Sequence, residues 1–226
     1  MPPAALTAKL FSGRVVTSEV RAFEALEPLF EQEQRYVARA VEKRRREFQA
    51  GRHCARRALE MLGAEGVAIP AGEDRAPCWP PGFVGSITHT GKLETAFAAA
   101  AVARAAEVQG VGLDAEQTEP LGEELMGHVL TDTERRALDA EPASERALLA
   151  KLIFSAKEAF YKCQYPLTLQ YLGFHDVEVE LDRHSATFRA MLLTASGRFP
   201  RSTSFTGRFV LDSELMLTGV EYPFPD

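Results

Sequence analysis

Residues 110–116, Gly-Val-Gly-Leu-Asp-Ala-Glu, stand between two stretches of chain that have a similar order of elements. They predict a short buried strand that runs out into an acidic loop. Before this strand come a helix and two strand-like segments, and after it come helices followed by strand hairpins. We therefore expect an α+β fold of two similar lobes with antiparallel sheets, residues 1–109 and residues 110–226.

The first lobe begins its regular structure with the strongest local helix pattern of the chain, over residues 31–62. A loop rich in Gly and Pro follows over residues 63–82. Two strand-like segments, 83–88 and 95–104, are separated by a turn around Gly91. The lobe is therefore expected to place one long helix against a small antiparallel sheet.

The second lobe contains a helix start signal and then several alternating strands. Thr131-Asp132-Thr133-Glu134 predicts a capping box that opens a helix. A longer helix is expected over residues 144–165, ending at Pro166. Beyond it, apolar residues recur with a period of two, and polar turns at 182–185 and 212–214 predict antiparallel hairpins.

Composition narrows the class of protein. With 46% hydrophobic and 26% charged residues, the chain is an ordinary globular protein, and its net charge of -6 argues against a general nucleic-acid binder. Its cysteines, at positions 54, 78 and 163, lack the paired spacing of zinc or redox sites. Because no signal peptide or membrane-spanning run is evident, we expect a cytoplasmic protein that is not bound to membranes.

A basic island interrupts this acidic chain. Residues 35–57 carry nine Arg or Lys residues and two Glu residues. Helical geometry places Arg44 within the apolar stripe of the helix and Arg52 at its border. Arginines near a core face either extend to the helix edge, pair with buried carboxylates or bind an anion such as phosphate.

Two carboxylates share one face of the central strand. Alternation places Asp114 and Glu116 together, with Leu113 and Ala115 on the opposite face, and their Cα atoms roughly 6–7 Å apart. Like charges so placed repel each other, so a positive group is expected between them. A divalent cation such as Mg²⁺ meets this need, although such a pair also occurs on exposed edge strands.

The helix over 144–165 has a polar face opposite its apolar one. Lys151, Ser155, Glu158 and Lys162 lie on this polar face, and Glu158 and Lys162 are four residues apart. Such a pair is commonly only a helix-stabilising contact. The aromatic residues Phe154, Tyr161, Tyr165 and Tyr171 make a pocket wall an alternative, although aromatic core packing explains them equally well.

Taken in order, these segments resemble a known family. The matching segments are Lys43-Arg44-Arg45-x-Glu47-Phe48, Arg52-His53-Cys54-Ala55-Arg56, Pro77-Cys78-Trp79-Pro80, Gly85-Ser86-Ile87-Thr88-His89, Val111 to Glu116, and Phe154-Ser155-Ala156-Lys157-Glu158 followed by Tyr161-Lys162. In this order and spacing they resemble the two-lobed 4′-phosphopantetheinyl transferases of siderophore, polyketide and nonribosomal peptide synthesis, particularly the actinobacterial type. The resemblance spans residues 43 to about 174.

This resemblance implies a role for each matched residue. Arg44 and Arg52 would hold the 3′-phosphate and nearby nucleotide of coenzyme A, while Thr88 and His89 would bind its phosphates. Mg²⁺ would be ligated by the set Asp114, Glu116 and Glu158, with the carbonyl of Ala115 close to the ion. Lys162 would meet the pyrophosphate, Leu172 would line the groove for the pantetheine arm, and Glu158, Lys162 and His89 would be the catalytic residues.

The loop before Trp79 departs from the family pattern. The family usually has a basic residue there that touches the nucleotide, and Arg75 is our candidate in the shorter loop 71–76. The implied partners are coenzyme A and an apo acyl or peptidyl carrier protein, with a monomeric enzyme. Two alternatives stay open: a Mg²⁺-dependent nucleotide pyrophosphate hydrolase and a non-catalytic module that binds coenzyme A.

Overall fold

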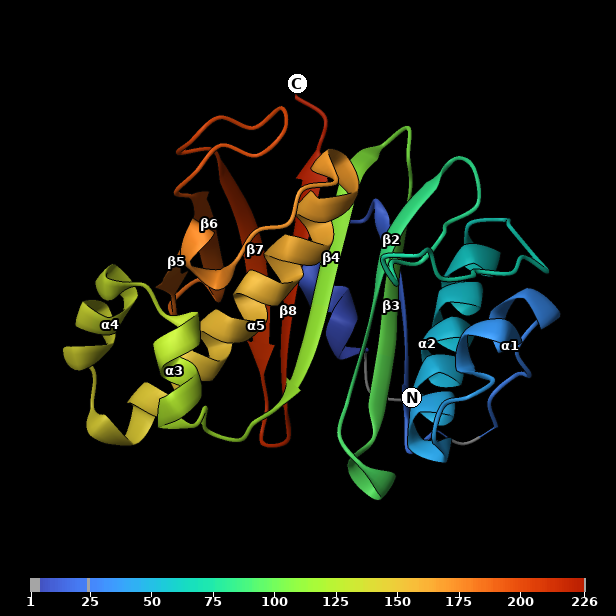
Figure 1. Ribbon diagram of the computed structural model, residues 1–226, viewed down its shortest axis with the longest axis horizontal. Coiled ribbons are helices and arrows are strands. Elements are labelled where there is room, and N and C mark those ends of the chain that lie inside the picture. Colours follow the sequence, from blue (N-terminus) through green and yellow to red (C-terminus); the bar gives the residue numbers. More distant parts are fainter. Residues whose placement is uncertain (1–4, 24, 226) are drawn as a thin grey trace.

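The computed structural model describes residues 5–23 and 25–225. They form helices and strands on two antiparallel sheets (Figure 1), which confirms the α+β class. The first half contains η1 (Leu6–Leu10), β1 (Val15–Arg21), α1 (Glu31–Val37), α2 (Glu42–Met61), β2 (Phe83–Thr90), η2 (Leu93–Thr95) and β3 (Phe97–Arg104). The second contains β4 (Val108–Gln117), α3 (Glu123–Val129), α4 (Asp132–Asp139), α5 (Ala143–Thr168), η3 (Phe174–Asp176), β5 (Val177–Asp182), β6 (Thr187–Leu192), β7 (Ser204–Leu211) and β8 (Leu215–Pro223).

The two sheets differ in size. The first has the strand order β1-β3-β2 and is covered by α2, and the second has the order β4-β8-β7-β6-β5 and is crossed by α5 (Figure 1). The alternating residues of β5 to β8 lie in antiparallel ladders, as their period of two predicted. No helix within the described ranges has the length and apolar composition needed to cross a bilayer.

The first predicted helix is divided into two. Residues 38–41 leave the helix, so α1 and α2 are separate elements. Arg45, in the first turn of α2, donates from Nε to the carbonyl of Val37 at 3.2 Å and from Nη2 to that of Ala38 at 3.0 Å. These bonds satisfy carbonyls at the end of α1, so the chain can turn there without losing hydrogen bonds.

Pro166 does not end α5, contrary to our expectation. The helix continues to Thr168 and is closed by Leu169, whose left-handed backbone donates its N–H to the carbonyl of Tyr165 at 2.8 Å. A proline so close to the end removes only the bond to the carbonyl of Lys162. The last turn therefore tolerates it.

The two sheets meet at their edge strands, β2 and β4. Ser86 Oγ accepts the N–H of Leu113 at 3.0 Å, and Thr88 Oγ1 accepts that of Ala115 at the same distance. Hydroxyl side chains here replace the carbonyls of a normal ladder, which satisfies the edge of β4. This junction brings the end of β2 beside the carboxylates of β4.

Glycine allows α5 to touch β4. A Cβ atom at Gly112 would lie 1.8 Å from the carbonyl oxygen of Ala159 and 2.8 Å from the nitrogen of Cys163. Asp114 and Glu116 follow on the same face of the strand, because side chains alternate. The close approach at Gly112 therefore holds α5 over both carboxylates.

We expect Gly112→Ala to destabilise the protein strongly, because backbone atoms rather than a flexible side chain would have to move. Overpacking of this kind costs about 3 kcal/mol at the upper end of its usual range. At roughly 2–4 °C per kcal/mol, Tm should fall by about 6–12 °C in thermal unfolding.

The matched control is Gly127→Ala in α3, where the nearest atom to a new Cβ is the Arg135 Nη2 at 3.6 Å. Removal of a helical glycine should stabilise by about 0.5–1 kcal/mol. An unchanged Tm for Gly112→Ala would contradict the close approach of α5 to β4.

Candidate active site

Asp114 is the buried centre of the site. Its Oδ2 accepts the Ser155 hydroxyl at 2.8 Å, and its Oδ1 accepts Lys162 Nζ at 2.7 Å. Ser155 Oγ also lies 2.8 Å from Thr218 Oγ1, on β8. The polar face of α5 predicted from the sequence thus points toward β4, and the Asp114 carboxylate is held from two sides.

Glu116 and Glu158 complete an acidic group around Asp114. Glu116 Oε2 lies 2.6 Å from Lys151 Nζ, whereas Glu158 has no hydrogen-bond or ion-pair partner among the described residues. Burial raises the pKa of Glu116, and the charge of Asp114 raises it further. Burial also raises the pKa of Glu158, to which the charges of Asp114 and Glu116 add. The three carboxylates therefore act on one another electrostatically.

The donor set suits a hard divalent cation, but the side chains do not form a ready-made cage. Within residues 5–23 and 25–225, no three His, Cys, Asp or Glu side chains already converge as metal ligands. The ammonium groups of Lys162 and Lys151 neutralise Asp114 and Glu116 instead. The carboxylate oxygens of Asp114, Glu116 and Glu158 are ligands of the kind that Mg²⁺ prefers. Because burial and mutual repulsion raise the pKa values of Glu116 and Glu158, a positive ion between them would be favourable, and it would displace the two lysines.

His89 and Arg44 form a polar group beside the carboxylates. Arg44 Nη1 lies 2.9 Å from His89 Nε2, and His89 Nδ1 lies 3.9 Å from Glu47 Oε2. Arginine can only donate, so Nε2 accepts and the neutral ring carries its proton on Nδ1. Burial lowers the pKa of His89, and Glu47 opposes this shift while Arg44 and Lys162 add to it.

Arg44 differs from its predicted position. It is exposed rather than buried in the apolar stripe, because it lies in the first turn of α2, before the first buried residue of that helix, Phe48. Thr88 and Ala115, in contrast, are buried at the sheet junction. There the Thr88 hydroxyl supports the backbone of Ala115 and keeps its own proton available for another acceptor.

Arg52 and Arg56 are both buried on α2 but are bound differently. Arg56 meets both oxygens of Glu33, at 3.2 and 2.9 Å, and also Glu27 and the carbonyl of Pro28. Arg52 has one hydrogen bond, from Nε to the carbonyl of Ile69 at 2.7 Å, and stacks on Phe48. Burial lowers the pKa of Arg52 to about 10. Its remaining N–H groups have no partner among the described residues, so Arg52 is suited to an anion.

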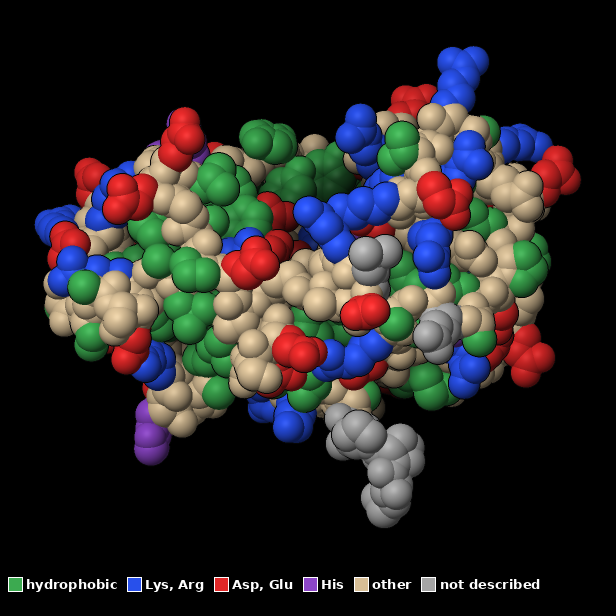
Figure 2. All heavy atoms as spheres, turned by 90° about the horizontal axis from the view of Figure 1, so that it is seen from below, with side chains coloured by type: hydrophobic (Ala, Val, Ile, Leu, Met, Phe, Trp, Pro, Cys, Tyr) green, Lys and Arg blue, Asp and Glu red, His purple; other side chains and the backbone are tan. Residues whose placement is uncertain are grey.

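Basic residues occur on both halves of the molecule but are more numerous on the α1–α2 side (Figure 2). In Figure 2, Lys and Arg side chains are more numerous over that half, and hydrophobic side chains gather over the other. A cavity of about 520 Å³ between the halves is lined by Arg75, Cys78, Ser86, Lys162 and Tyr165, among others. Arg75 has a left-handed backbone, with φ of 68°, and its N–H donates to the carbonyl of Gly72. The structure thus places Arg75 and Lys162 in one cavity.

Leu172 lies in a second, smaller cavity. This cavity, of about 140 Å³, is lined by Glu158 and Tyr161 on α5 and by Tyr171, Leu172 and Phe174 in the following segment. Tyr161 also lines the larger cavity, so the two adjoin along α5. The tyrosines therefore line cavities, whereas Phe154 packs against the core and Phe174, so each alternative left open by the sequence holds for part of the aromatic set.

Three supporting residues were not among the predicted site residues. Lys151 and Ser155 bind the strand carboxylates, and their shared helical face with Glu158 and Lys162 was the available signal. Glu47 contacts both Arg44 and His89, and its position three residues after Arg44 places it on the same face of α2. The sequence carried no sign that it would meet a histidine 42 residues later.

Comparison with known proteins gives consistent matches over both halves. A family model described as "4′-phosphopantetheinyl transferase N-terminal domain" matches residues 32–103, and one described as "4′-phosphopantetheinyl transferase superfamily" matches residues 110–213. The chain is 39% identical over 201 residues to 4′-phosphopantetheinyl transferase Npt of Nocardia iowensis, covering 84% of this chain and 87% of that protein.

Two further relatives are also 4′-phosphopantetheinyl transferases. The chain is 40% identical over 203 residues to 4′-phosphopantetheinyl transferase Svp of Streptomyces mobaraensis, covering 87% of this chain and 80% of that protein. It is 36% identical over 194 residues to 4′-phosphopantetheinyl transferase PptT of Mycobacterium tuberculosis, covering 81% of this chain and 82% of that protein.

Proposed function

The chain belongs to the 4′-phosphopantetheinyl transferase superfamily, and on that premise we propose how its site works. It transfers the 4′-phosphopantetheine arm of coenzyme A to a serine of an apo acyl or peptidyl carrier protein. The reaction depends on Mg²⁺ and releases 3′,5′-ADP. The observation that carries the proposal is the bond of Asp114 to Lys162 at the contact of β4 with α5, where Asp114 acts by charge on both Glu116 and Glu158.

The nucleotide of coenzyme A is assigned to residues 1–109. Arg52 offers unused donors from a buried position, and Arg44 lies beside His89 at the mouth of the site. A guanidinium group matches phosphate oxygens in pairs, which suits Arg44 and Arg52 to the 3′-phosphate. Arg75 faces the same ligand from the loop, and Thr88 and His89 face its pyrophosphate.

The metal and the arm are assigned to residues 110–226. Asp114, Glu116 and Glu158 would hold Mg²⁺, with the Ala115 carbonyl nearby. When bound, the ion supplies positive charge to the transferred and leaving phosphates. Lys162, freed from Asp114, donates to the pyrophosphate, and the small cavity with Leu172 receives the pantetheine arm.

The transfer itself needs one base and several donors. The carrier serine oxygen attacks the phosphorus nearest pantetheine, and the bond from that phosphorus to the oxygen of 3′,5′-ADP breaks. The serine proton passes to Glu158, directly or through water. Burial and the charges of Asp114 and Glu116 raise the pKa of Glu158 in the metal-free protein, and a bound cation would oppose this shift. Lys162 and His89 stabilise the charge on the leaving group.

We also propose the cellular compartment and the oligomeric state of the enzyme. We place the enzyme in the cytoplasm as a monomer that binds neither membranes nor nucleic acid. Its three cysteines are free, as expected in a reducing compartment. A hydrolase of nucleotide pyrophosphates and a non-catalytic binding module remain as the rival functions that an assay must distinguish.

The direct test incubates the protein with coenzyme A, Mg²⁺ and an apo carrier protein, and then weighs the carrier by mass spectrometry. We expect a gain of one phosphopantetheine that EDTA abolishes. Asp114→Asn and Glu158→Gln keep the size of each side chain and should slow transfer by about 10²–10⁴-fold. Glu180→Gln, an exposed residue paired with Arg189, is the control and should retain transfer. Release of phosphate products without a change in the carrier would support the hydrolase instead.

A second prediction concerns the two buried arginines. Arg52→Ala should weaken binding of 3′,5′-ADP about 10-fold or more in calorimetry, because a hydrogen bond to a charged group is worth about 1.5–3 kcal/mol. Arg56→Ala leaves buried Glu33 without its partner and should instead lower the stability by about 3–5 kcal/mol. If Arg52→Ala bound 3′,5′-ADP with unchanged affinity, the assigned role of Arg52 would be wrong.

A further inference from the structure

A buried lysine next to Glu158 joins three segments of the second half. Lys157 is 2% exposed, and its Nζ donates to Glu134 Oε2 at 2.8 Å, to the carbonyl of Val129 at 2.8 Å and to the carbonyl of Phe174 at 2.7 Å. An ammonium group has three donors, so all of them are used. Lys157 thus ties α5 to the end of α3, to α4 and to the segment that follows α5.

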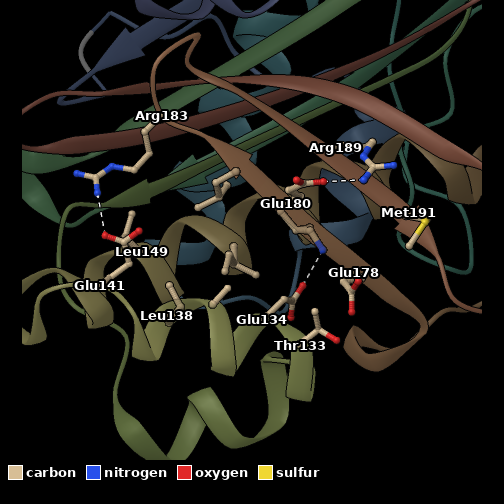
Figure 3. A pocket seen from close by; sticks show the side chains of 14 residues that line it. Thr133, Glu134, Leu138, Glu141, Leu149, Glu178, Glu180, Arg183, Arg189 and Met191 are labelled. Atoms are coloured by element: carbon tan, nitrogen blue, oxygen red, sulfur yellow. Dashed lines mark hydrogen bonds and ion pairs between the residues drawn. The ribbon is translucent and has the colours of Figure 1, made fainter.

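Its partner, Glu134, is equally buried and fully bonded. Oε2 also accepts the N–H of Thr131 at 2.7 Å, which closes the capping box of α4, and Oε1 accepts the N–H of Val179 at 2.7 Å. Figure 3 shows Glu134 at the base of its pocket, with the bond to β5 drawn as a dashed line. The carboxylate therefore fixes α4 to β5, and Lys157 fixes both to α5.

The pair forms a partition between two cavities. Lys157 lines the small cavity that also contains Glu158 and Leu172. Glu134 lines a cavity of about 380 Å³ on the other side, between α4, α5, β5 and β6 (Figure 3). The wall of the small cavity nearest to this partition is the segment 171–174, whose Phe174 carbonyl is one of the three acceptors of Lys157.

The hydrogen bonds of Lys157 fix the position of the Phe174 carbonyl more closely than apolar side chains would. A buried ion pair adds little stability compared with apolar residues of the same size, but it fixes a main-chain carbonyl at one place. We propose that Lys157 and Glu134 are positioning residues, which hold the segment 172–174 at a fixed distance from Glu158 and so set the width of the groove for the pantetheine arm. This inference rests on the proposed function, because it needs the arm to occupy the small cavity.

The test compares coenzyme A with 3′,5′-ADP, which has the nucleotide but lacks the arm. The double variant K157M/E134Q removes both charges and keeps the size of each side chain, and the glutamine oxygen still accepts one of the N–H groups of Thr131 and Val179. We expect calorimetry to show affinity for 3′,5′-ADP within about twofold of wild type, while the advantage of coenzyme A over 3′,5′-ADP falls at least about tenfold. Glu178→Gln is the matched control, since Glu178 acts on Lys157 by charge without bonding to it.

Each outcome decides a separate point. A merely structural pair would lower Tm and leave both affinities of the folded protein unchanged, and that result would overturn the positioning role. An equal loss for both ligands would overturn it too, because the damage would not be specific to the arm. If the wild-type protein bound neither ligand, the proposed function itself would be wrong. If the wild-type protein bound both ligands and the double variant had the same two affinities, only this inference would be wrong.

Discussion

The proposed activity depends on three carboxylates that act on one another by charge at the contact of β4 with α5. Asp114 is bonded to Lys162 and Ser155, and Glu116 is bonded to Lys151. Among the described residues Glu158 has no such bond and is affected by the charges of Lys162, Asp114 and Glu116 alone. Because the pKa values of Glu116 and Glu158 are raised on folding, the folded state binds more protons than the unfolded state between the ordinary and the raised values. Stability should therefore decrease as pH rises through that window, and a bound cation would offset this loss.

This arrangement requires contributions from both halves of the chain. Ser86 and Thr88 of β2 bond to the backbone of β4, so the histidine that follows them lies beside the carboxylates. A shared core that includes Phe97, Leu113 and Leu217 fixes the two sheets to each other. The site therefore lies at a junction between rigid elements, where both ends of a long ligand can be held at once.

Much of this could be predicted from local sequence. The period of two over β5 to β8, the capping box at Thr131 and the shared face of Asp114 and Glu116 are properties of short segments. The division of α1 from α2 could not be predicted in this way, because it depends on hydrogen bonds from Arg45 to carbonyls at the end of the preceding helix. The close contact at Gly112 and the buried pair of Lys157 with Glu134 depend on tertiary packing, and the sequence shows only a glycine and two ordinary charges.

The most direct measurement is a crystal structure of the protein with coenzyme A and Mn²⁺, in which anomalous scattering locates the ion. The account predicts one ion bound by oxygen atoms of Asp114, Glu116 and Glu158 at about 2.0–2.2 Å, with Lys162 moved from Asp114 to the pyrophosphate. An ion located elsewhere, with Lys162 still bound to Asp114 and Lys151 to Glu116, would contradict it.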